Sequence, residues 1–239
     1  MNAIIRSSFV MGLVTCSALA LSQGCASSDD DDTKPAGGNT GGATGGSTAP
    51  AANQITFTDG KASGLMTGYG WMALGVKDSI SSPTCGGTPI TKYAPCNTTT
   101  TWSSKNALCA TGEIPKLPDS AVQSDYDDNW GILIGFDNNE SSTGNIGKVF
   151  STIDVSVSGS PTTGLRVLVN KEGEATSYCA DYAGKPIALS KFNTACWEPA
   201  KGKDLTEFDK ITKVGVQVSS TATAAIKVDN LCLNSVTFN

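Results

Sequence analysis

Short runs in which apolar and polar residues alternate recur from residue 54 to the end of the chain. The apolar members of the clearest runs are Ile153, Val155 and Val157; Leu165, Val167 and Val169; Val214, Val216 and Val218; and Ala224, Ile226 and Val228. A period of two places successive side chains on opposite faces of a strand. Because Gly, Pro, Ser, Asn and Asp separate the runs, the pattern predicts an all-β fold, an antiparallel β-sandwich whose sheets have one buried and one hydrated face.

Further apolar runs extend this pattern through the domain. They are Gln54–Phe57, Tyr69–Val76, Trp130–Phe136 and, at the end of the chain, Val236–Phe238. The run at 130–136 is apolar enough to predict a central, well-covered strand. Trp71 and Trp130 lie inside such runs, which favours a place in the core for both indoles.

Helical signals are weak, since no stretch shows a long period of 3.6 residues. Short helices are expected near Ser120–Asp128 and at Leu205–Lys210. At the second of these, Asp204 as N-cap and Glu207 three residues later match a capping box. The predicted sandwich therefore carries one or two short helices.

The first 24 residues have the layout of an export signal. Arg6 supplies a positive charge, and segment 9–21 is almost wholly apolar or small but too short to span a bilayer. The run Leu-Ser-Gln-Gly-Cys that ends at Cys25 resembles the lipobox of bacterial lipoproteins, in which a peptidase cuts before the cysteine and the sulfur carries diacylglycerol. Ser22 stands where that family prefers an aliphatic residue. The alternative is an ordinary export signal, with Cys25 unmodified.

Residues 25–52 are predicted to comprise the lipidated Cys25 and a disordered tether, followed by a sandwich domain at 53–239. The tether is rich in Gly, Thr, Ser and Asp and has almost nothing to bury. The aspartates at 29–32 are expected to be solvated, because a calcium site needs ligands interleaved with turn residues. Ala26 after the cysteine implies, by resemblance to lipoproteins, sorting to the outer membrane.

Charge and composition exclude several classes of function. The formal charge of 17 − 22 = −5 becomes 16 − 22 = −6 once residues 1–24, which contain only Arg6, are removed. An acidic chain is a poor ligand for nucleic acid. The chain has no histidine, which excludes Ser-His-Asp catalysis and HExxH zinc sites. The paired acids at 127–128 and at 172 and 174 lie in polar stretches, where nothing indicates the burial that a general acid needs.

Six cysteines remain after Cys25, and an even number in an exported chain predicts three disulfides. They are Cys85, Cys96, Cys109, Cys179, Cys196 and Cys232. Three of them fall between Ser82 and Pro118, a region expected to be a long disulfide-rich loop. Fifteen connectivities are open, and proximity favours Cys85 with Cys96, Cys179 with Cys196, and Cys109 with Cys232.

The order of several features resembles the galactose-binding-like jelly-roll domains found in many carbohydrate-binding modules. The features are Ile55–Gly60, Gly68–Trp71, Ser190–Asn193, Trp197, Leu205 with Phe208, the valine run at 214–218 and Val228-Asp-Asn-Leu231. The resemblance covers residues 54–81 and 130–239. In this family the segment equivalent to 228–231 begins the last strand and often lies beside a structural calcium ion. By analogy, Asp59 and Asp229 are candidate calcium ligands, with an Asx turn at each position as the alternative; no cofactor is required.

In such modules the ligand lies on the concave sheet or at loop tips, held by aromatic faces and hydrogen-bonding side chains. If the valines of the alternating runs point inward, the polar residues between them point outward. The candidate ligand-binding residues are Trp102, Arg166, Asn170, Tyr178, Trp197 and Gln217. A guanidinium can fork between two hydroxyl groups; the alternative for Arg166 is a register-fixing ion pair with a surface carboxylate. Trp102 is the best candidate for a solvent-facing platform, with coverage of the disulfides as its alternative.

The sequence thus predicts a surface-anchored lipoprotein that binds a polysaccharide or other glycan without modifying it. Its partners would be the glycan and, through Cys25, the membrane, and not nucleic acid. One alternative is a structural or adhesive surface protein that contacts another protein. A weaker alternative is a small glycoside hydrolase or lyase.

Overall fold

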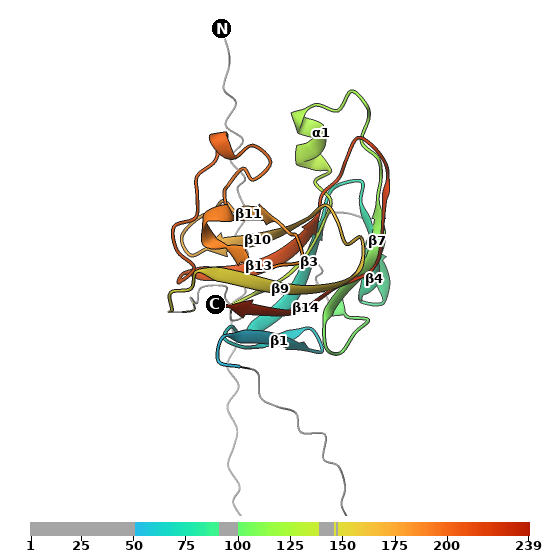
Figure 1. Cartoon of the computed structure of the whole chain (residues 1–239). Coiled ribbons are helices and arrows are strands. Elements are labelled where there is room, and N and C mark those ends of the chain that lie inside the picture. Colours follow the sequence, from blue (N-terminus) through green and yellow to red (C-terminus); the bar gives the residue numbers. More distant parts are fainter. Residues whose placement is uncertain (1–50, 91–99, 139–145, 147) are drawn as a thin grey trace, which may run out of the picture. The chain divides into compact units, whose positions relative to one another are not determined.

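The computed structural model describes residues 51–90, 100–138, 146 and 148–239, which belong to one compact unit, Ala49–Asn239. The predicted signal segment, Cys25, Cys96 and nearly all of the predicted tether lie outside the described residues. The fold is an antiparallel β-sandwich, as the alternating pattern predicts (Figure 1). No helix among the described residues has the length and apolar character needed to cross a bilayer.

One layer is a five-stranded sheet that carries the candidate site. Its strands, in spatial order, are β11 (Tyr178–Asp181), β10 (Leu165–Lys171), β13 (Ile211–Val218), β8 (Ile132–Asp137) and β3 (Gly68–Leu74). Every neighbouring pair is antiparallel. The predicted central strand is β8, between β13 and β3. The inward-facing valines of β10 and β13 are buried as the period of two requires.

The second layer is built around the long strand β14 (Ile226–Phe238). One edge of β14 pairs with β9, and the other pairs first with β7 and then with β1. The other strands of this layer extend it, and β2 links β1 to β3 of the five-stranded sheet. Their bounds are β1 (Gln54–Thr58), β2 (Lys61–Gly64), β4 (Ser79–Cys85), β5 (Thr88–Ile90), β6 (Thr100–Thr101), β7 (Leu108–Ile114), β9 (Thr152–Ser160) and β12 (Ile187–Ala188).

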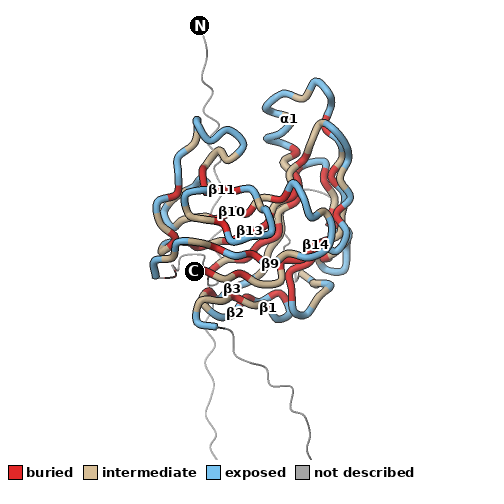
Figure 2. Tube along the Cα trace, in the orientation of Figure 1, coloured by how far each residue is buried: buried red, intermediate tan, exposed pale blue. Residues whose placement is uncertain are grey.

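Aromatic contacts join the two layers in the core. Phe57 of β1 meets Phe136 of β8 edge-on, with ring centroids 5.2 Å apart. Phe208 contacts both Phe192 and Phe238, with ring centroids 5.5 and 5.7 Å apart. Such edge-to-face pairs stabilise by about 0.5–1.5 kcal/mol beyond the area that they bury. Figure 2 shows the buried residues following the strands, whereas α1 (Gln123–Asp128) contains no buried residue.

The two helix predictions have different outcomes. The helix near 120–128 is confirmed as α1, where the backbone N–H of Val122 donates to Asp125. The helix at Leu205–Lys210 is wrong, because no helix forms there. Asp204 instead forms a bridge with Asn193, and Leu205 is buried in the core. Tertiary pairing thus overrides the capping pattern. Two short 3₁₀ helices, Leu189–Lys191 and Pro199–Lys201, lie upstream.

Two of the three predicted disulfides are confirmed, Cys109–Cys232 and Cys179–Cys196. Cys85 is also disulfide-bonded, but its predicted partner Cys96 lies outside the described residues, so this pairing stays a prediction. The expected loop from Ser82 to Pro118 is less irregular than predicted. It contains the end of β4 and all of β5, β6 and β7, because Leu108, Ala110 and Ile114 pack into the core.

Candidate functional site

The candidate site lies on the outer face of the five-stranded sheet, opposite the core. The strand registers align one outward-facing residue from each strand into a row that crosses the sheet. The row is Ala73, Leu133, Gln217, Arg166 and Asp181. Two residues along each strand, a second row has glycine at its second and third positions; it consists of Trp71, Gly135, Gly215, Leu168 and Cys179. The predicted outward placement of Arg166 and Gln217 is therefore confirmed.

Arg166 is held from two sides but stays accessible. Its Nε lies 3.6 Å from Oδ1 of Asp181, directly opposite on β11, and its Cζ lies 5.8 Å from the ring centroid of Trp197. The arginine side chain is 26% exposed and that of Asp181 is 82% exposed. The register-fixing ion pair considered from the sequence is thus present. An exposed pair of this kind contributes about 0–1 kcal/mol, so it orients the guanidinium without sequestering it.

Trp197 offers an indole to solvent beside this arginine, with 60% of the residue exposed. The preceding residue, Cys196, is bonded to Cys179 of β11, which lies two residues before Asp181 on the same face of the strand. This covalent link fixes the start of the loop that carries Trp197. The indole can therefore stand beside the sheet although it belongs to no strand.

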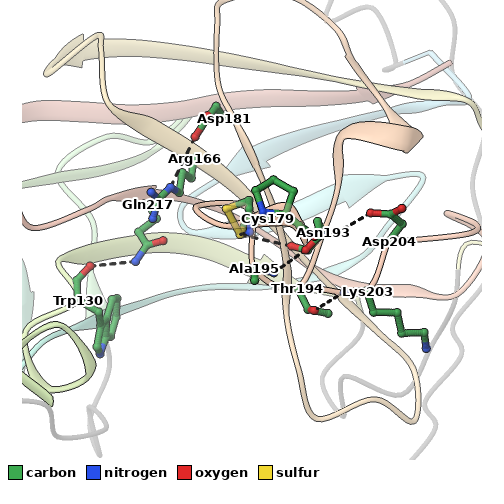
Figure 3. Close-up of a disulfide and its surroundings, with 12 residues drawn as sticks. Trp130, Arg166, Cys179, Asp181, Asn193, Thr194, Ala195, Lys203, Asp204 and Gln217 are labelled. Carbon is green, nitrogen blue, oxygen red and sulfur yellow. Dashed lines mark hydrogen bonds and ion pairs between the residues drawn. A yellow bond between two sulfur atoms is a disulfide. The ribbon is translucent and has the colours of Figure 1, made fainter. Parts of the chain in front are cut away.

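Asn193 holds the same loop by its side-chain amide. Its Nδ2 donates to Asp204 at 2.6 Å and to the carbonyl oxygen of Pro199 at 3.3 Å, and its Oδ1 accepts from the backbone N–H of Ala195 at 2.8 Å. Its own backbone pairs with that of Cys179 in both directions. Figure 3 shows this network on one side of the disulfide, with Arg166 and Gln217 on the other. The loop is preorganised by one covalent bond and a set of partly buried hydrogen bonds.

Gln217 lies directly opposite Arg166 on β13. Its Nε2 donates to the backbone oxygen of Trp130 at 2.9 Å (Figure 3), which fixes the orientation of the amide. Trp130 itself is only partly buried, so its expected place in the core is wrong. It precedes the strand rather than lying within it, because β8 begins at Ile132.

A buried carboxylate holds the backbone next to Trp130. Asp78 is 1% exposed, and its Oδ2 accepts from the backbone N–H groups of Gly75 at 2.9 Å and Gly131 at 3.1 Å. Its Oδ1 has no hydrogen-bond partner among the described residues. Burial raises the pKa of Asp78 above its ordinary value, against the opposing effect of the two backbone hydrogen bonds. This carboxyl group supports the end of the sheet from inside the protein.

Trp71 also belongs to the candidate site, although the apolar run around it predicts a place in the core. It lies on the outer face, where its Nε1 donates to Oδ1 of Asp137 at 2.6 Å and Nζ of Lys213 lies 5.8 Å from its ring centroid. A Cβ added at Gly135 would lie 2.8 Å from Cζ2 of Trp71, so the indole lies in space that only glycine leaves open. The period of two could have found it, because Leu74 is buried and residues 71 and 73 then point outward.

The other three candidate ligand-binding residues are elsewhere or buried. Asn170 shares the outer face but lies four residues from Arg166 along β10, about 13 Å at the usual rise per residue. Tyr178 is 1% exposed, and its hydroxyl donates to Glu174 at 2.6 Å, so its assignment to an exposed surface is wrong. Trp102 is partly buried against the core beside Gly60, where it cannot serve as a fully exposed platform.

An ionic cluster surrounds the hydroxyl of Tyr178. Lys171 contacts Glu207 at 2.8 Å and Glu174 at 3.8 Å, and Lys203 also lies 3.8 Å from Glu174. The hydrogen bond from Tyr178 lowers the pKa of Glu174, and burial raises the pKa of Tyr178. Each charged group of this cluster already has a partner within it, which favours a structural role for Tyr178.

Asp59 and Asp229, the candidate calcium ligands, lie in different local settings. Asp59 is in the turn between β1 and β2 with φ of +49°, and Asp229 lies opposite Ser160 in the β14–β9 pair. The described residues contain no group of three or more His, Cys, Asp or Glu side chains that could hold a metal ion. The calcium site stays a prediction.

No protein-family model, curated protein or solved structure matches the chain. The resemblances to lipoproteins and to galactose-binding-like domains therefore stay predictions from sequence.

Proposed function

We propose that the outer face of the five-stranded sheet binds carbohydrate without modifying it. The observation that carries the proposal is the exposed indole of Trp197, held beside the accessible guanidinium of Arg166 and the amide of Gln217. A sugar ring has C–H groups on one face and hydroxyl groups around its rim. An aromatic face with planar donors at its edge complements both parts of the ring.

The rigid positions of Trp197 and Gln217 support a role for these side chains in ligand binding. The disulfide and Asn193 order the Trp197 loop before any ligand arrives, and Trp130 fixes the amide of Gln217. Groups that are already ordered lose little conformational entropy on binding. Trp71, also on this face, offers a second aromatic contact for a ligand longer than one sugar.

The carboxylates of this face favour binding over hydrolysis. Glycoside hydrolysis requires two carboxyl groups that flank one bond, one of them able to donate a proton. Asp137 is engaged by Trp71 and Lys213, and Asp181 is highly exposed beside Arg166. Neither lies in the water-excluded setting in which a carboxyl group serves as a general acid.

We place this binding face on a lipoprotein of the outer membrane. The support is the sequence alone: the export signal, the lipobox-like residues before Cys25 and the polar tether up to residue 52. An acyl chain on Cys25 with a flexible spacer would present the sandwich to glycans around the cell.

The test is binding of the full chain, purified in detergent, to a panel of immobilised glycans. We expect Trp197→Ala to weaken binding by about ten-fold, a loss of about 1.4 kcal/mol. Trp102→Ala is the matched control, because it removes an indole that is not part of this face. Equal losses in the two variants, or wild-type binding to cell-surface protein and to no glycan, would contradict the proposal; the second result would favour the adhesive alternative.

A further inference from the structure

A pocket of about 430 Å³ opens beside Arg166 at the end of the five-stranded sheet. It lies between the turn that joins β9 to β10 and the segment that follows β13. Its lining residues are Pro161, Thr163, Gly164, Arg166, Val218, Ser219, Ser220, Thr221 and Ile226. Arg166 thus borders both this pocket and the ring of Trp197.

The chemistry of the lining is one positive charge among hydroxyl groups. Arg166 is the only charged residue of the lining, and four others carry hydroxyl groups. Pro161, Val218 and Ile226 supply apolar wall. A pocket with one cation, several hydroxyl groups and no acid in its lining suits a ligand that presents a single negative group on a partly apolar body.

The presence of arginine rather than lysine indicates that the negative group is planar. The chain has two arginines, Arg6 and Arg166, against 17 − 2 = 15 lysines, so lysine supplies nearly every other positive charge. A guanidinium differs from an ammonium by its planar fork of donors, which matches a carboxylate in two parallel hydrogen bonds. The contact of Arg166 with Asp181 is through Nε at 3.6 Å, and a guanidinium carries further N–H donors on its two terminal nitrogens.

Ser219 adds an unused hydroxyl group to the wall. Its Oγ is buried and has no hydrogen-bond partner among the described residues. An unpaired buried polar group costs about 1–3 kcal/mol. Ser219 belongs to the lining, so a change of its χ1 rotamer is the movement by which its hydroxyl could donate a hydrogen bond to a bound carboxylate oxygen.

We propose that this pocket binds the carboxylate of an acidic sugar, a uronate residue, within the glycan held by the outer face. This inference rests on the proposed carbohydrate binding and names the class of sugar. The chain has a formal charge of −5, so a general attraction of polyanions cannot produce the preference. It must come from the local fork of Arg166 and from the unpaired hydroxyl of Ser219, because Ser220 already donates to the backbone oxygen of Asn129 and Thr221 pairs with Thr223.

The test compares matched ligands that differ only in the carboxyl group. Oligomers of galacturonate and of alginate are titrated into the full chain in detergent, each beside its methyl ester of the same length. We expect at least one acid form to bind about ten-fold more tightly than its ester, the usual scale of a hydrogen bond to a charged group. Arg166→Gln should abolish that preference and Arg166→Lys should keep only part of it, because the ammonium retains the charge without the fork.

Three results would overturn the inference. They differ in whether they also contradict the proposed carbohydrate binding. Equal affinity for acids and esters would remove the carboxylate site and leave carbohydrate binding intact. If dextran sulfate bound as tightly as the uronate oligomers, the protein would recognise negative charge alone, with no preference for a planar carboxylate. Absence of binding to these ligands and to every neutral glycan would remove the proposed function together with the pocket.

Discussion

The two faces of the five-stranded sheet come from the same strands but follow different rules. The inner face of β10 and β13 consists mainly of fully buried aliphatic side chains, namely Leu165, Val167, Val169, Val214, Val216 and Val218. The outer face of the same strands carries Arg166, Asn170, Lys213 and Gln217, with Gly215 among them. All of the side chains on this outer face are partly exposed, and several are held by specific partners.

This difference shows where stability and function separate in the sandwich. Interchangeable apolar groups pack the inner face, so its free energy depends on volume and burial. The outer face contributes little to that core, yet it orders an arginine, an amide and an indole at defined positions. Substitutions on the inner face should therefore mainly lower the unfolding free energy, and those of the exposed side chains on the outer face should mainly change ligand affinity.

The largest expected effect is on the inner face. Phe136→Ala removes the ring that meets Phe57 across the layers, and we expect a loss of about 3–5 kcal/mol of unfolding free energy. Urea unfolding measures this loss. Under conditions where the variant stays folded, its glycan affinity should equal that of the wild type. A marked loss of affinity in the folded variant would break the separation of the two faces.

The next effect distinguishes the two confirmed disulfides. Replacing either pair with serines should lower the unfolding free energy by about 2–4 kcal/mol. Only Cys179→Ser with Cys196→Ser should also weaken glycan binding, because this bond anchors the loop of Trp197. Cys109→Ser with Cys232→Ser is the matched control in the other layer. Calorimetry and the glycan titration measure both quantities; equal losses of affinity would contradict the account.

The sequence predicted the inner face more completely than the outer one. A period of two is sufficient to assign Val167 or Val216 to the core, because burial depends only on which side a residue faces. It also placed Arg166 and Gln217 outward. The same rule applied from Leu74 would have placed Trp71 outward, but the apolar run around it favoured the core.

The remaining errors depend on contacts between distant segments. Nothing local to Tyr178 indicates that its hydroxyl donates a hydrogen bond to Glu174 inside the fold. The capping pattern at Asp204 was outweighed by its bridge to Asn193. The pocket beside Arg166 is lined by segments that are more than fifty residues apart in the sequence, so no local motif could have predicted it.

A pH series tests the buried support of the sheet end. Burial raises the pKa of Asp78 in the folded protein above the unfolded value of 3.8, so its contribution to stability is present below that pH and is lost as pH rises through the folded pKa. Asp78→Asn keeps an acceptor for Gly75 and Gly131 without the charge. Wild type should therefore lose stability relative to Asp78→Asn as the pH rises above the unfolded value of 3.8 and through the raised pKa of the folded protein. Urea midpoints that change in parallel would contradict this.

The smallest effect concerns the pocket wall. Ser219→Ala removes a buried hydroxyl group without a partner, so we expect the free protein to gain about 1 kcal/mol, a rise in Tm of about 2–4 °C. The same variant should bind the uronate ligand less tightly. Ser156→Ala, an exposed position on β9, is a control that should change neither quantity. A loss of stability in Ser219→Ala would show that its hydroxyl is structural.

The most direct test of carbohydrate binding by the outer face is hydrogen exchange of the full chain with and without a bound glycan. We expect slower exchange in the outer-face strands and the Trp197 loop, at residues 165–170, 195–198 and 213–219. Exchange at 108–114, in β7 of the other layer, should stay unchanged. Protection confined to the other layer, or no protection with a glycan that binds, would contradict the assignment.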